Sequence, residues 1–154
     1  MPMQFVIPIA IKPYLKKYLA KTLEVDAFEI SRANPYGNYL LNCLRPPTMK
    51  VLGKNTYQID VKVHSEIMRA TLGEKYWKQR GHVITYLEQY YFNKFVDQIF
   101  RDEMYKYIWM RVGKRGSLNQ AINTFCAHYG ITEDDLALKT IQKWQERRAR
   151  LESA

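Results

Sequence analysis

The feature of this sequence that most constrains its fold is a long helical pattern that starts near Gly81 and runs to about Val112. Aromatic residues recur throughout this segment: Tyr86, Tyr90, Tyr91, Phe92, Phe95, Phe100, Tyr105, Tyr107 and Trp109. At helical spacing such residues are typical of a core, although aromatic rings can also stack on nucleic-acid bases. The predicted buried stripe comprises Ile84, Leu87, Tyr91, Phe95 and Ile99. Gln98 and Asp102 break a strict heptad, so the pattern disfavours a long coiled coil but leaves the 81–112 helix available as a homodimer interface.

Shorter elements are predicted on the N-terminal side of this helix. Strands are predicted at residues 5–11, 27–31 and 56–63, and helices at 13–23, 35–44 and 65–76. Pro8 interrupts the first strand, which favours either an edge position in a sheet or an irregular strand. Ser65 is expected to cap the third of these helices. The side chains of that helix expected to face the core are Ile67, Met68 and Leu72.

Capping signals define two further helices near the C-terminus. Two pairs have the spacing of a helix cap: Ser117 with Gln120, and Thr132 with Asp135. Gly130, between them, is a typical helix stop. The final helix, ending near Leu151, is expected to place on one face Ile141, Trp144 and Leu151. The sequence therefore predicts a mostly helical α+β fold, with a body at 1–112 and a small helical module at 113–154.

The charge balance favours an anionic partner. Lys and Arg number 24 against 15 Asp and Glu, a formal net charge of +9. Neutralising phosphates with such cations releases counterions and gives affinity without sequence specificity. The expected nucleic-acid-binding residues lie in the C-terminal module: Lys114, Arg115, Lys139, Lys143, Arg147 and Arg150. A second basic patch lies on the 13–23 helix and just before it: Lys12, Lys16, Lys17 and Lys21. The members of both sets on helices also fit the solvated faces of ordinary amphipathic helices. Lys114 and Arg115, between Gly113 and Gly116, also fit a linker.

The C-terminal module resembles the helix-turn-helix class of DNA-binding proteins. The resemblance covers about residues 117–151 and rests on two capped helices, the second with a basic face and an aromatic anchor. It implies that the last helix meets DNA. Lys139 departs from the pattern, because this class usually has a buried aliphatic residue there. In general style, a basic α+β body with a basic helical tail resembles small regulators of phages and mobile elements.

A second resemblance concerns residues 56–100, whose predicted strand, helix, basic turn and helix follow the order of a ribbon–helix–helix protein. That resemblance implies base contacts from the outward side chains of the strand. These would be Gln58, Asp60 and Lys62. The extra strands, the long last helix and the acidic Asp60 depart from that class. A strand within a mixed sheet is the competing interpretation.

Chemical motifs are sparse, and we expect a protein that is not an enzyme and holds no metal or cofactor. His64, His82 and His128 lack the spacing of a metal site, and no phosphate-binding glycine loop or nucleophile elbow appears. A catalytic pair of carboxylates stays open. The isolated Cys43 and Cys126 suggest a reducing, cytoplasmic compartment. The N-terminal segment lacks the basic start of a signal peptide, and no run of eighteen apolar residues predicts a membrane span.

The leading hypothesis is a DNA-binding regulator or accessory protein, with RNA as a further possible ligand. Its last helix would contact phosphates through its basic face. The alternative is a non-enzymatic structural or adaptor protein of a larger assembly such as a phage particle. In that case the protein would be associated with the virion, and its basic surface would meet acidic protein or packaged nucleic acid.

Overall fold

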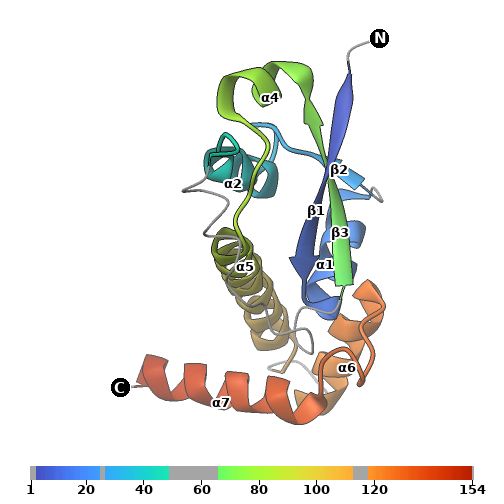
Figure 1. Ribbon diagram of the computed structural model, residues 1–154. Helices are drawn as coiled ribbons and strands as arrows, with labels where there is room; N and C mark the ends of the chain where they lie inside the picture. Colours follow the sequence, from blue (N-terminus) through green and yellow to red (C-terminus); the bar gives the residue numbers. More distant parts are fainter. Residues whose placement is uncertain (1–2, 25–26, 49–65, 113–117, 154) are drawn as a thin grey trace. The chain divides into compact units, whose positions relative to one another are not determined.

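The computed structural model describes residues 3–24, 27–48, 66–112 and 118–153. Its elements are β1 (Gln4–Ile11), α1 (Pro13–Leu23), β2 (Ala27–Glu29), α2 (Pro35–Cys43), β3 (Glu66–Gly73), α4 (Glu74–Arg80), α5 (Tyr86–Val112), α6 (Leu118–Tyr129) and α7 (Leu138–Ser153) (Figure 1). The fold is α+β and mostly helical, as the sequence predicts. The chain forms two compact units, Met1–Asp97 and Gln98–Ala154, so the division falls within α5. The sequence had suggested a boundary at residues 112–113.

The strands form one sheet in the first unit. Within the described residues the strand order is β1-β3-β2, with β1 antiparallel and β2 parallel to β3. The edge position predicted for β1 from Pro8 is therefore confirmed. One face of the sheet is buried through Ile7, Ile9, Met68, Ala70 and Leu72. The helix α1 lies along the sheet, behind β1 and β3 in Figure 1, and buries Tyr14, Leu15, Tyr18 and Leu19.

Local signals set the ends of α1 and α2. Pro13 occupies the first turn of α1, where its missing N–H costs nothing. The side chain of Asn34 caps α2 by accepting a hydrogen bond from the Gly37 N–H at 2.7 Å. Pro35 follows at the first helical position. Both helices begin where the sequence predicted, because caps of this kind depend only on neighbouring residues.

The helix predicted at 65–76 is wrong. Residues Glu66–Gly73 form β3, and α4 begins only at Glu74. Burial alternates along β3, with Met68 buried and Ile67 53% exposed, which is the period of a strand. β3 is held by a partner strand on each side, and this pairing overrides local helix preference. The ribbon–helix–helix resemblance loses the helix on which it depended. The strand predicted at 56–63, with Gln58, Asp60 and Lys62, lies outside the described residues.

The buried face of α5 also differs from the predicted stripe. Leu87 and Tyr91 are 37% and 49% exposed. The apolar residues buried along α5 are Phe92, Val96, Phe100, Met104 and Ile108. In its first half this face also carries buried polar residues at four-residue spacing. These are Gln89, Asn93 and Asp97, with Thr85 just before the helix. A stripe of this kind requires specific partners, since a buried polar group without a hydrogen bond is costly.

The partners lie on the outer edge of β1. Gln89 Oε1 accepts a hydrogen bond from the Ala10 N–H at 2.9 Å, and Asn93 Oδ1 accepts one from the Lys12 N–H at 3.0 Å. Asn93 Nδ2 donates to the Ala10 carbonyl at 2.9 Å. Further along α1, the Tyr14 hydroxyl donates to Asp97 Oδ1 at 2.8 Å. Side chains of α5 therefore take the place that a fourth strand would occupy beside β1.

Replacing Asn93 with Leu is expected to destabilise the first unit by about 3 kcal/mol, because the Ala10 carbonyl of β1 and the Lys12 N–H just after it lose their partners without gaining water. The measurement is the free energy of unfolding from urea titration followed by circular dichroism. Asn38 is exposed on α2, so Asn38→Leu is the matched control and should change stability by less than about 0.5 kcal/mol. Equal effects of the two variants would contradict a special role for the Asn93 amide.

Candidate nucleic-acid interface

The second unit is built around α6. This helix buries Ala121, Ile122 and Phe125, and it ends at Gly130, whose φ of +70° is the left-handed conformation typical of a glycine stop. The predicted C-terminal end of α6 is therefore confirmed at Tyr129–Gly130. Its start at Leu118 agrees with a cap at position 117, which itself lies outside the described residues.

The connection from α6 to α7 is longer than a helix-turn-helix turn. Residues 130–137 separate the two helices, whereas that motif uses three or four residues. The predicted Thr132–Asp135 pair is present, with Asp135 Oδ2 accepting from the Thr132 N–H at 2.9 Å. It holds the connecting turn rather than the helix start. Instead, Glu133 Oε2 accepts from the Leu138 N–H at 3.0 Å, in the first turn of α7.

The basic face predicted on α7 is exposed. Its members are Lys139, Lys143, Arg147 and Arg150. Steps of four, four and three residues place them along one stripe of the helix. Arg150 also lies 3.8 Å from Glu146 on the same helix, in an exposed pair that contributes little to stability. Lys114 and Arg115, the other two predicted contacts, lie outside the described residues.

The opposite side of α7 is buried over less of its length than predicted. Ile141 is 1% exposed and belongs to the core, as expected, and the neighbouring Gln145 is buried as well. Leu151, predicted to face inward, is 77% exposed. It lies in the last turns of α7, where it lines an open groove instead of a closed core.

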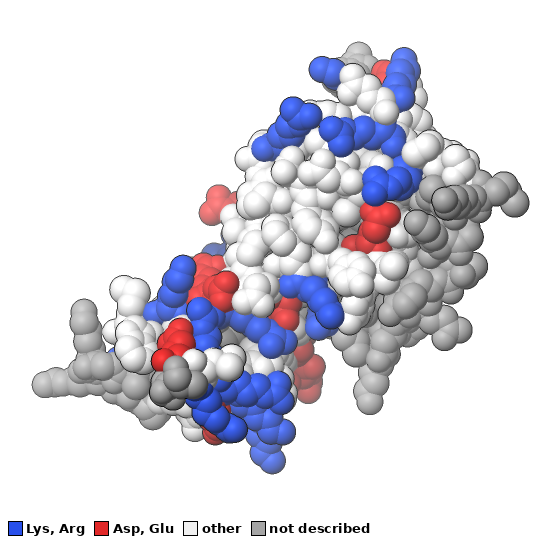
Figure 2. All heavy atoms as spheres, turned by 90° about the vertical axis from the view of Figure 1, so that its left-hand side faces the viewer, with Lys and Arg blue, Asp and Glu red and all other residues white. Residues whose placement is uncertain are grey.

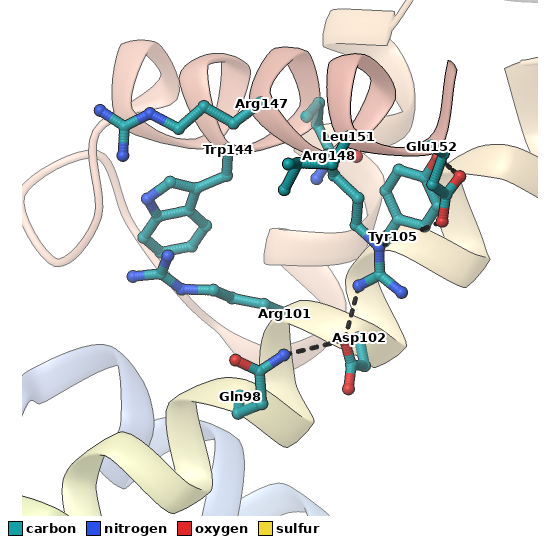
Figure 3. Close-up of a pocket in the computed structure, with 10 residues that line it drawn as sticks. Gln98, Arg101, Asp102, Tyr105, Trp144, Arg147, Arg148, Leu151 and Glu152 are labelled. Atoms are coloured by element: carbon teal, nitrogen blue, oxygen red, sulfur yellow. Dashed lines mark hydrogen bonds and ion pairs between the residues drawn. The ribbon is translucent and has the colours of Figure 1, made fainter. Parts of the chain in front are cut away.

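That groove lies between the second half of α5 and α7 and has a volume of about 380 Å³ (Figure 3). Two arginines stack on aromatic rings across it. The Arg101 guanidinium carbon lies 3.7 Å from the centre of the Trp144 ring, and that of Arg148 lies 4.2 Å from the Tyr105 ring. Each pair joins one residue of α5 to one of α7, so cation–π contacts connect the two helices.

Two carboxylates complete the groove. Asp102 forms an ion pair with Arg148. Glu152 accepts a hydrogen bond from the Tyr105 hydroxyl at 2.6 Å and lies 3.6 Å from Arg148. The hydrogen bond to Glu152 raises the pKa of the Tyr105 phenol. Arg148 is thereby oriented toward α5, whereas its neighbour Arg147 is exposed.

The sequence analysis placed Trp144 on the inner face of the last helix and Arg147 on its basic face, but it did not bring either together with residues of α5. It selected none of the other stacked or paired groove residues, Arg101, Asp102, Tyr105, Arg148 and Glu152. The signal that could have found them is a pair of four-residue spacings, Arg101 to Tyr105 in α5 and Trp144 to Arg148 in α7. Each spacing puts one arginine and one aromatic ring on one face of a helix, in opposite order. Without knowing that the two faces meet, neither spacing stands out in a chain rich in both residue types.

The second basic patch, on α1, has acidic and aromatic neighbours. Lys16 Nζ lies 3.3 Å from Glu66 Oε2, and Lys12 Nζ lies 6.0 Å from the centre of the Tyr14 ring. Lys17 and Lys21 share the helix, Lys21 being exposed in its last turn. On the face of the molecule drawn in Figure 2, Lys and Arg side chains are interspersed with Asp and Glu.

The cysteines are poor candidates for nucleophiles. Burial, with the nearby Glu88 adding to the effect, raises the pKa of Cys43 to about 12. Burial and the charge of Glu133 raise the pKa of Cys126 to about 11. Both thiols are protonated at neutral pH, and the thiolate is the reactive form. Among the residues that the structure describes, no group of three or more His, Cys, Asp or Glu side chains is placed to hold a metal ion.

Alkylation of Cys126 by iodoacetamide at pH 8 is expected to be about a hundredfold slower than that of an exposed cysteine, since a raised pKa lowers the thiolate fraction tenfold per unit. The rate should rise about tenfold per pH unit up to pH 10. Mass spectrometry resolves the two cysteines, and the same protein in denaturant is the control. Fast labelling of the folded protein at pH 7 would show that one thiol is activated.

Comparison with known proteins gives no relative from which a function can be transferred. The chain matches no protein-family model, no curated protein and no solved structure. Within the described part of the chain, no helix is both long and apolar enough to cross a membrane. The exposed basic stripe of α7 and the groove beside it therefore have to be interpreted from their own geometry.

Proposed function

We propose that the protein is a non-enzymatic nucleic-acid-binding regulator or accessory factor of the cytoplasm, and that α7 contacts DNA or RNA phosphates. The observation that carries this proposal is the exposed stripe of four basic side chains on one face of α7. Flexible cations spaced one helical turn apart can each neutralise a phosphate. The net charge of +9 would attract a polyanion from a distance and speed the encounter.

A second candidate is an adaptor or structural protein of a larger assembly, such as a phage particle. It is favoured by large apolar side chains exposed on α5. Trp109 and Met110, near the end of the helix, are 72% and 71% exposed. Adjacent apolar residues of this size often mark a protein interface. Near the start of α5, Tyr86 and Tyr91 are also exposed. A homodimer formed through α5 would bury one of these two pairs, Tyr86 with Tyr91 or Trp109 with Met110.

The double variant Lys143→Ala/Arg147→Ala is expected to weaken DNA binding and to reduce the slope of log K against log salt by about 2, since each lost phosphate contact accounts for roughly 0.9. Fluorescence anisotropy of a labelled oligonucleotide at several salt concentrations measures both quantities. The fold should stay intact, because both side chains are exposed.

Lys17→Ala/Lys21→Ala removes the same charge from α1 and serves as the matched control. It should leave the slope nearly unchanged if α7 makes the contacts. Equal losses from both variants would indicate a diffuse electrostatic surface. If the unaltered protein binds no DNA or RNA at low salt, the proposal is wrong and the adaptor function takes its place.

A further inference from the structure

The groove between α5 and α7 presents flat, cationic and aromatic surfaces to solvent. Trp144 and Tyr105 contribute rings, and Arg101 and Arg148 stack on them at 3.7 and 4.2 Å. Aromatic rings and guanidinium planes are the surfaces on which unpaired nucleobases stack in single-strand-binding proteins. Such stacking tolerates any sequence, because every base has a π-face.

The size of the groove suits one nucleotide. Its volume of about 380 Å³ falls at the lower end of the range for small-molecule sites. A base within a duplex is already stacked on both sides, so it reaches a side groove only after unpairing, which costs a few kcal/mol. An unpaired strand offers its bases without that cost.

The two ends of the groove differ in charge, and this difference would orient a bound nucleotide. In Figure 3, Trp144 lies with Arg101 and Arg147 at one end, whereas Asp102 and Glu152 lie at the other. The two carboxylates are held there by Arg148 and the Tyr105 hydroxyl. A phosphodiester would therefore be favoured at the Trp144 end, where Arg101 and Arg147 lie, and not at the end where Arg148 pairs with the two carboxylates. Arg147 belongs both to this end of the groove and to the exposed stripe that includes Lys143.

We infer that this groove binds an unpaired nucleobase against Trp144, with adjoining phosphates on Arg147 and Lys143. The ligand of α7 is then single-stranded DNA or RNA in preference to duplex. This inference rests on the proposed function and deepens it by naming the ligand class. Phosphate contacts alone explain binding to any nucleic acid, whereas the groove explains a preference for unpaired strands.

The first test uses the fluorescence of Trp144 to detect binding at the groove. In the full chain carrying Trp77→Phe and Trp109→Phe, Trp144 is the sole tryptophan. This protein is titrated with single-stranded DNA, single-stranded RNA and duplex DNA of about 12 nucleotides or base pairs, a length within known single-strand site sizes. Both single strands, or one of them, should quench Trp144 emission and bind about tenfold tighter than the duplex, as one base stack provides.

The second test removes the ring. Trp144→Leu is expected to weaken single-strand binding about tenfold, to leave duplex binding unchanged and to keep the salt slope, because no charge is lost. Trp144→Phe keeps a ring and should restore most of the single-strand affinity. Tyr91→Leu, an exposed aromatic on the first half of α5, is the matched control and should have no effect. If Trp144→Leu alters the circular dichroism spectrum, the quenching of the folded sole-tryptophan protein decides.

The outcomes separate this inference from the proposed function. Equal affinity for single strands and duplex, without a change in Trp144 emission, would overturn the base-binding groove and leave the phosphate contacts of α7 in place. Equal quenching by duplex would overturn it as well. The absence of binding to any of the three ligands at low salt would overturn both.

Discussion

The hydrogen bonds from Gln89 and Asn93 to the outer edge of β1 are the interaction on which the first unit depends. An edge strand exposes unpaired N–H and C=O groups that invite association with other chains. Here the amides of α5 satisfy Ala10 and Lys12 on that edge. Pro8 fits the same arrangement: it lies two residues from Ala10 and shares its orientation, so its missing N–H falls on the α5 side and leaves the ladder with β3 intact.

The same hydrogen bonds explain why the buried face of α5 is partly polar in its first half and apolar in its second half. Before residue 98 its buried face alternates apolar residues with Gln89, Asn93 and Asp97, because it must match the backbone of β1 and the Tyr14 hydroxyl. After residue 98 the deeply buried positions are apolar, and Arg101 and Tyr105 flank them to form one wall of the groove. The change coincides with the division of the chain into two units inside a continuous helix. One helix thus meets two different packing requirements.

Sequence reasoning succeeded where the signal was local and failed where it required a distant partner. Proline and asparagine caps located α1 and α2, and Gly130 located the end of α6. β3 was missed because its strand state depends on β1 and β2, which are far away in the sequence. The buried amides of α5 were missed because Gln and Asn in a helix usually face solvent. For the candidate site, the exposure of the α7 stripe followed from its spacing, but the groove required knowing that Arg101 meets Trp144.

Neighbouring arginines on α7 show why a count of charges describes this surface poorly. Arg147 is exposed, whereas Arg148 stacks on Tyr105 and pairs with Asp102, so its charge is largely compensated within the protein. The role of Arg148 is to position its neighbours. It holds the Tyr105 ring, Asp102 and Glu152 at one end of the groove. The exposed positive charge of α7 lies on its stripe, where Arg150 also pairs with Glu146. If α7 binds nucleic acid as proposed, cationic contacts set its affinity for phosphates, and the groove beside Trp144 determines whether single strands or duplex bind more tightly.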